Sequence, residues 1–150
     1  MEIERKFLLK SLPDLSCYSY HILEQAYLNT DPVIRIRRED ENYYLTYKGK
    51  GLLTREEYNL PLNAASYQHL LPKADGVIIR KKRYLIPYES YTVELDIFLP
   101  PYDSLIIAEV EFSSEEEASL FSPPSWFDRE VTYDPSYNNS NLSKGKDLPL

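Results

Sequence analysis

The sequence is poor in cysteine and histidine, and it lacks a long hydrophobic run. It has one cysteine and two histidines in 150 residues, which excludes an internal disulfide framework and leaves few ligands for a typical zinc site. No apolar stretch approaches the roughly 20 residues that a membrane span requires. The opening segment is charged from Glu2 onward, unlike a secretory signal. We therefore expect a cytoplasmic protein without a membrane partner.

Basic residues are also in the minority, with 17 Lys and Arg against 24 Asp and Glu and a formal net charge of −7. This balance argues against nucleic acid as a partner, because phosphate backbones require a broad basic surface. The sequence has no Walker A loop, no GxGxxG and no Ser/His/Asp or Cys/His pattern. His21, His69 and Cys17 stand apart from the charged motifs, so we expect structural or surface roles for them.

Strand-like segments dominate the chain, and its length fits one domain over residues 1–150. Short connections between these segments favour antiparallel pairing, and eight such strands favour a closed or nearly closed β-barrel. The predicted class is therefore mainly β, with a few helices packed outside. The expected strands cover residues 2–9, 20–29, 33–40, 43–49, 54–61, 77–87, 91–99 and 105–113. Helices are expected at 64–72 and 114–121, a weaker turn at 11–16, and a short strand at 129–132 in an otherwise irregular tail.

Like charges two residues apart are the most conspicuous feature of these strands. The acidic pairs are Glu2/Glu4, Glu94/Asp96 and Glu109/Glu111, and the basic pairs are Arg35/Arg37 and Lys81/Arg83. On a strand such neighbours share one face, roughly 6.5–7 Å apart, and repel unless a counter-ion joins them. A solvated face explains any single pair, but solvated faces usually mix the two signs. Turned into one lumen, the acids suit Mg²⁺ or Mn²⁺ and the bases suit a phosphate chain.

An ordered set of motifs resembles the CYTH superfamily, the triphosphate tunnel metalloenzymes. EIERKF at 2–7 is similar to the family's ExExK, and QAYL at 25–28, VIRIR at 33–37 and LTYKGKG at 45–51 follow in the expected order. TREEYNLPL at 54–62, KKRY at 81–84, VELDIF at 93–98, AEVEF at 108–112 and the tail at 130–142 complete the set. The resemblance implies an eight-stranded antiparallel β-barrel that forms a tunnel, with helices outside it.

The resemblance also implies roles for individual residues. The catalytic acids would be Glu2, Glu4, Glu109 and Glu111, and the metal ligands would be these four together with Glu94 and Asp96. The triphosphate would be held by Lys6, Arg35, Arg37, Lys48, Lys81 and Arg83, with Glu57 as a provisional member of the site. Ala26 and Asn59 depart from the family pattern, which often has Gly and an acid there. Arg55 could line the tunnel or pair on the surface.

The implied activity is divalent-metal-dependent hydrolysis of a triphosphate. Inorganic tripolyphosphate would give pyrophosphate and orthophosphate, with Mg²⁺ or Mn²⁺, two ions, as cofactor. The alternatives within the family are a class IV-type adenylyl cyclase and a nucleoside or thiamine triphosphatase. A polyphosphate-binding module without activity is the third alternative, and the complete acidic set argues against it. The sequence leaves open the physiological substrate, the preferred metal, and whether the protein forms a homodimer.

Overall fold

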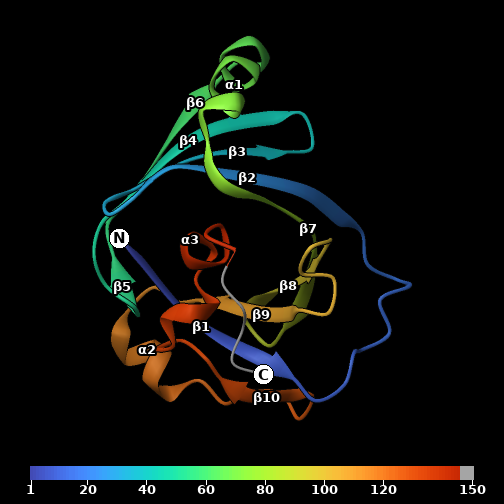
Figure 1. Ribbon diagram of the computed structural model, residues 1–150. Coiled ribbons are helices and arrows are strands. Elements are labelled where there is room, and N and C mark those ends of the chain that lie inside the picture. The colour runs from blue at the N-terminus through green and yellow to red at the C-terminus, as the bar shows by residue number, and fades with distance from the viewer. Residues whose placement is uncertain (146–150) are drawn as a thin grey trace.

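The computed structural model describes residues 1–145, which form one strongly curled antiparallel sheet with short helices around it (Figure 1). The ten strands within these residues are β1 (Glu2–Leu9), β2 (Tyr20–Thr30), β3 (Val33–Glu39), β4 (Asn42–Lys48), β5 (Thr54–Arg55), β6 (Glu57–Leu62), β7 (Asp75–Tyr88), β8 (Tyr91–Phe98), β9 (Ile106–Glu111) and β10 (Phe127–Glu130). The helical segments are α1 (Ala64–Leu70), η1 (Leu71–Lys73), α2 (Glu115–Leu120), η2 (Pro135–Tyr137) and α3 (Asn139–Leu142). No helix in this part of the chain is long and apolar enough to cross a membrane.

The strand order explains how the sheet curls into a partly closed barrel. It runs β10-β1-β9-β8-β7-β2-β3-β4-β6, and the short β5 pairs with β1 away from this path. Because β5 directly precedes β6, the pairs Glu2–Arg55 and Ile3–Thr54 bring the far end of the sheet back to its beginning. The rest of that side of β1 is taken by β10. The predicted antiparallel β architecture is confirmed, as a half-barrel in which the strand expected at 54–61 is divided into β5 and β6.

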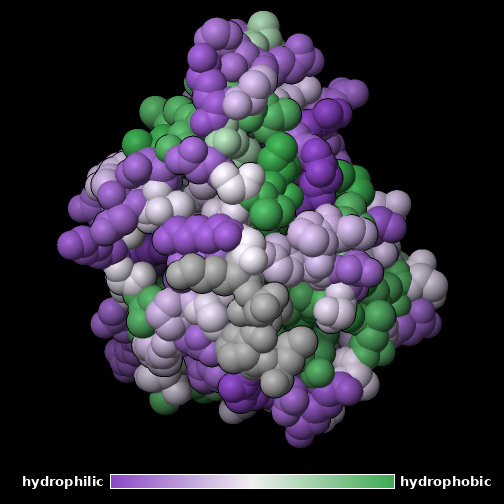
Figure 2. Space-filling model, viewed as in Figure 1, coloured by the Kyte–Doolittle hydropathy of each residue, from purple (hydrophilic) through white to green (hydrophobic). Residues whose placement is uncertain are grey.

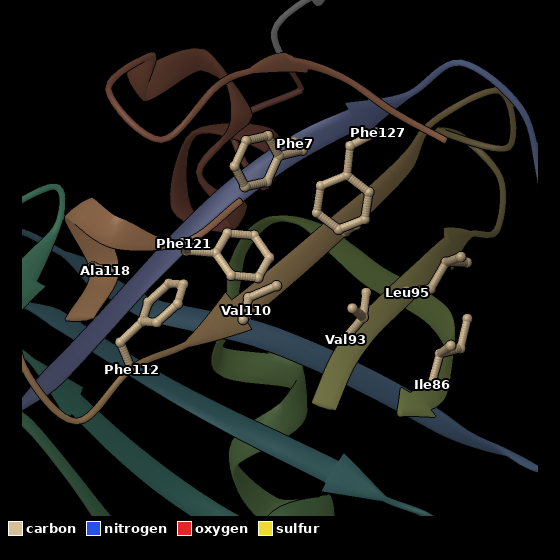
Figure 3. Packing of buried hydrophobic residues seen from close by; sticks show 10 residues of the cluster. Phe7, Ile86, Val93, Leu95, Val110, Phe112, Ala118, Phe121 and Phe127 are labelled. Carbon is tan, nitrogen blue, oxygen red and sulfur yellow. The ribbon is translucent and has the colours of Figure 1, made fainter. Parts of the chain in front are cut away.

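The main hydrophobic core lies outside the curl, between the sheet and the segment that carries α2 and leads into β10. Phe7 and Phe112 pack there against Phe121 and Phe127, and Val93 and Val110 face them from the strands (Figure 3). A second layer, formed by Tyr67 of α1 and buried residues of β2 and β3, covers the opposite half. Since apolar side chains alternate with charged ones along each strand, this packing turns the charged faces inward.

The helices follow the prediction in the middle of the chain and differ from it at both ends. The Ser114 hydroxyl caps α2 by accepting a hydrogen bond from the Glu117 N–H, as a favourable start for a helix requires. The weak helical turn expected at 11–16 is wrong, because that segment is an irregular connection. The tail, expected to be irregular, contains η2 and α3, and its predicted short strand lies at 127–130.

Candidate active site

A charged cavity of about 380 Å³ lies between the two halves of the sheet. Seventeen residues line it, of which seven are glutamates, six are lysines or arginines, and one is aromatic. They are Glu2, Glu4, Lys6, Gln25, Tyr27, Arg35, Arg37, Glu39, Lys48, Arg55, Glu57, Asn59, Arg83, Glu94, Glu109, Glu111 and Asn139. A lining with almost no apolar groups suits charged ligands better than apolar ones.

The structure brings eleven of the thirteen predicted site residues into this lining. The two that stay outside it are Lys81 and Asp96. Arg55, whose position the sequence left open, lines the cavity, with its Nε 3.6 Å from Glu2 Oε1. Gln25 and Tyr27 were missed, although the two-residue period of β2 places both on the face opposite Ala26. Asn139 was also missed, and no strand or helix pattern in the tail signals its position.

The acidic side of the cavity is built by β1, β8 and β9. Their register places Glu4 opposite Glu111, and Glu109 opposite both Lys6 and Glu94. Burial, opposed by Arg83 and reinforced by Glu109, raises the pKa of Glu94 to about 7. Burial also raises the pKa of Glu109 and of Glu111, and neighbouring carboxylates add to both effects. Burial is therefore the main cause of these raised pKa values, and it outweighs the nearby cations, among them Arg83, whose Nη1 lies 2.8 Å from Glu94 Oε2.

The chemistry of this donor set fits a hard divalent cation. Carboxylate oxygens are the ligands that Mg²⁺ and Mn²⁺ take in proteins. Burial raises the pKa of Glu94, Glu109 and Glu111, and a bound cation would favour their ionised form. Among residues 1–145, no three acidic, histidine or cysteine side chains converge into a ready coordination site. A bound cation would therefore draw together glutamate side chains that already lie on the acidic side of the cavity.

The basic side is built by β3 and β4 and has the opposite excess of charge. The Nε atoms of Arg35 and Arg37 are buried and donate no hydrogen bond to any group in the described chain. Burial, together with the charges of Arg35 and Arg83, lowers the pKa of Arg37. Burial and Arg35 also lower the pKa of Lys48, although its Nζ lies 3.0 Å from Glu2 Oε1. Buried donors that lack an acceptor fit an anion that accepts several hydrogen bonds.

Lys81 and Asp96 form a buried layer behind the acidic wall. Both side chains are excluded from solvent, with Lys81 Nζ 2.7 Å from Asp96 Oδ2. Arg83 donates from Nε and Nη2 to the two Asp96 oxygens, at 2.7 and 2.8 Å, and from Nη1 to Glu94 Oε2 at 2.8 Å. The Asp96 oxygens are thus occupied by two cations, and Arg83 connects this layer to the cavity.

Comparison with known proteins places this arrangement in a family. The family model of the CYTH domain matches residues 1–122. The chain belongs to the CYTH family. The inorganic triphosphatase of Nitrosomonas europaea is 38% identical over 147 residues, covering 95% of this chain and 96% of that protein. The inorganic triphosphatase of Acetivibrio thermocellus is 37% identical over 150 residues, covering 95% and 93%.

Solved structures agree with the CYTH assignment. A crystal structure of an inorganic triphosphatase is 34% identical, with a TM-score of 0.73, and the match covers 100% of this chain and 97% of that one. A crystal structure of a putative adenylate cyclase from Bacillus halodurans shares the fold at 20% identity, with a TM-score of 0.63 over 79% and 84% of the two chains. The fold is therefore common to proteins with different names.

The tail beyond the matched CYTH residues also borders the cavity. Lys6 Nζ donates to Asn138 Oδ1 at 3.3 Å, and the Lys6 backbone N–H donates to Thr132 Oγ1 at 2.9 Å. Asn139, at the start of α3, is part of the cavity lining. In Figure 1, α3 lies between the two halves of the sheet, at the open side of the curl. The tail thus contributes polar groups to the site of this CYTH protein.

Proposed function

We propose that the protein hydrolyses a linear triphosphate, with inorganic tripolyphosphate as substrate and pyrophosphate and orthophosphate as products. One observation carries the proposal: a cluster of glutamates, three of them with a raised pKa, lines the same cavity as two buried arginines whose Nε atoms lack an acceptor. A bound cation would favour the ionised glutamates, and a phosphate chain would accept hydrogen bonds from the arginines. The two curated relatives, each named inorganic triphosphatase, support the same reaction.

An inorganic substrate suits the lining better than a nucleoside or thiamine triphosphate. Tyr27 is the one aromatic side chain among the lining residues. Sites for an organic ring usually offer predominantly apolar and aromatic walls, and the described lining has no such wall. The buried donors of Arg35 and Arg37 suit phosphate oxygens, which accept hydrogen bonds on every side.

Five glutamates on the acidic side would hold the divalent cation, for which we propose Mg²⁺ or Mn²⁺. They are Glu2, Glu4, Glu94, Glu109 and Glu111. When bound, such a cation neutralises phosphate oxygens and lowers the pKa of a coordinated water. Asp96 is better placed as a positioning residue, because both of its oxygens are held by Arg83 and one also by Lys81. It would fix Arg83, the cation that reaches the cavity.

The chain's own residues bind and orient the substrate and stabilise the charge of the reaction. The oxygen of a water attacks the terminal phosphorus, the bridging P–O bond breaks, and its electron pair leaves on the pyrophosphate. One of the water's two protons passes to a carboxylate of the acidic side, and the other stays on the orthophosphate. The phosphate oxygens are held by Arg35, Arg37 and Lys48. In phosphoryl transfer, fixed cations of this kind provide most of the rate acceleration. No protein nucleophile is required.

The test measures orthophosphate release from tripolyphosphate in the presence of Mg²⁺ or Mn²⁺. We expect Glu4→Gln and Glu111→Gln each to lower turnover by about 100-fold or more, since each removes a charge that the site requires, while thermal unfolding stays close to wild type. Glu116→Gln, in the exposed first turn of α2, is the matched control and should retain activity. Wild-type turnover in both site variants would refute the assignment. Cyclic AMP from ATP would indicate a cyclase, and tight binding without product would indicate a binding module.

A further inference from the structure

A second cavity of about 290 Å³ adjoins the first one. Lys48 and Arg55 line both cavities, so the two spaces share these side chains as a common wall. The remaining lining comes from the β2–β3 turn, the loop after β4 and the tail. These residues are Thr30, Asp31, Pro32, Val33, Gly49, Lys50, Gly51, Asn138, Ser140, Asn141 and Lys144. A ligand that extends past Lys48 and Arg55 would therefore leave the first cavity and enter the second.

The charge of the second cavity differs from that of the first. Its lining has four cations, Lys48, Lys50, Arg55 and Lys144, against the single acid Asp31, whereas the first cavity has six cations against seven glutamates. Neither Lys50 nor Lys144 forms an ion pair within residues 1–145. The surface near β5 and the N-terminus is mainly hydrophilic (Figure 2). This cavity suits an anion and offers no set of ligands for a metal.

Both of these lysines project from segments whose backbone is fixed by the fold. Lys50 lies between Gly49 and Gly51, and Gly51 has φ +131°, where any Cβ would collide with the Thr54 carbonyl oxygen. Only glycine fits this close turn. On the other flank, the carbonyl of Ser143, directly before Lys144, accepts a hydrogen bond from the Val77 N–H. The two lysines thus reach the same cavity from two segments that are far apart in the sequence.

We propose that the second cavity binds the additional phosphates of linear polyphosphates longer than triphosphate. The chain would run from the first cavity past Lys48 and Arg55 to Lys50 and Lys144. The inference rests on the proposed function, and it widens the substrate class of the same site. The reaction is unchanged: water attacks the terminal phosphorus in the first cavity, the adjacent bridging P–O bond breaks, and the chain leaves shorter by one orthophosphate. One extended ligand with negative charge along its length matches the cations that line both cavities, two of which the cavities share.

The test compares two substrates in the double variant Lys50→Ala/Lys144→Ala. We measure kcat/KM for tripolyphosphate and for a linear polyphosphate long enough to fill both cavities, at constant ionic strength. For the long chain we expect a loss of about tenfold, the size of two exposed charge-assisted contacts, and for tripolyphosphate a loss of less than about twofold. Lys10→Ala/Lys73→Ala removes two exposed lysines that line neither cavity and serves as the matched control.

Equal losses for both substrates would overturn the inference, because they would show general attraction of polyanions instead of a subsite. No loss with the long chain would overturn it as well. Calorimetric titration of the same variants with the same two polyphosphates gives the comparison without turnover. If the wild type failed to hydrolyse tripolyphosphate, the proposed function would fail, while a selective loss of long-chain binding in the double variant would still support the second cavity.

Discussion

Asp96 is buried behind the cavity wall, where Lys81 and Arg83 contact both of its oxygens. Asp96→Asn keeps the shape of the side chain and removes its charge, so that two buried cations share a neutral amide. Removing one partner of a buried ion pair costs about 3–5 kcal/mol. Burial alone would raise the pKa of Asp96, but Arg83 and Lys81 outweigh it and lower this pKa from 3.8 to about 2, a difference worth about 2 kcal/mol. We expect the free energy of unfolding to fall by about 2–5 kcal/mol.

The pH dependence of this loss has a definite sign. The pKa of Asp96 is lower in the folded protein than in the unfolded chain, so its stabilisation is present above about pH 4 and disappears as the pH falls toward 2. Urea unfolding at about pH 7 should therefore separate wild type from Asp96→Asn, and the gap should narrow at about pH 3. The slope of the unfolding free energy against urea should stay the same.

Glu94→Gln is the matched control, because Glu94 lies on the same strand but lines the cavity. It should leave the protein folded and weaken Mn²⁺ binding, measured by calorimetry. The sequence suggested a metal-binding role for Asp96 as well. If Asp96→Asn had wild-type stability and lost Mn²⁺ binding as strongly as Glu94→Gln, Asp96 would be a ligand and the reasoning from its buried contacts would be refuted.

Two further predictions concern charged side chains of the cavity whose pKa is shifted mainly by burial. The pKa of Glu94 is about 7 in the folded protein, which is above its ordinary value. With a chelator present, its ionisation should therefore lower the free energy of unfolding by about 2–3 kcal/mol between about pH 5 and 8. Equal pH profiles of this free energy for wild type and Glu94→Gln would contradict the prediction. Arg37→Gln removes a buried cation whose pKa is lowered by burial and by Arg35, and should stabilise the ligand-free protein by about 1 kcal/mol while raising KM for tripolyphosphate about tenfold. A lowered unfolding temperature together with an unchanged KM would show that Arg37 has a structural role.

The two-residue period of the strands predicted which side chains face the cavity, because a strand allows only two faces. Along β1 it separated Glu4 and Lys6, which line the cavity, from Phe7, which packs in the outer core. The two-residue period does not show how deeply a side chain is buried, however. Glu94 and Asp96 share one face of β8, yet register places Asp96 beside Arg83 of β7, where it is buried. The burial of a side chain depends on the strands that pair with its own strand, and the sequence pattern of one strand carries no information about those neighbours.

The tail was beyond prediction for a different reason. Residues 138–141 have weak helix propensity, and α3 forms one short turn around them. Contacts from distant segments hold that turn: Leu142 is buried in a core cluster, and the Tyr102 hydroxyl donates to its carbonyl oxygen at 2.7 Å. Because these contacts exist only in the folded protein, the position of Asn139 at the cavity could not follow from local sequence.

The separation of charge inside the cavity links the binding of its two ligands. Its lining has seven glutamates and six lysines or arginines, so it is almost neutral as a whole, but direct ion pairs such as Lys48–Glu2 and Arg83–Glu94 join only part of this charge. Like charges on each side therefore repel, at a cost that the outer core must offset. A bound cation reduces the repulsion among the acids, and a bound phosphate chain reduces the repulsion among the bases. The cation and the phosphate chain also attract each other. By thermodynamic linkage, each ligand must then raise the affinity of the other by the same factor.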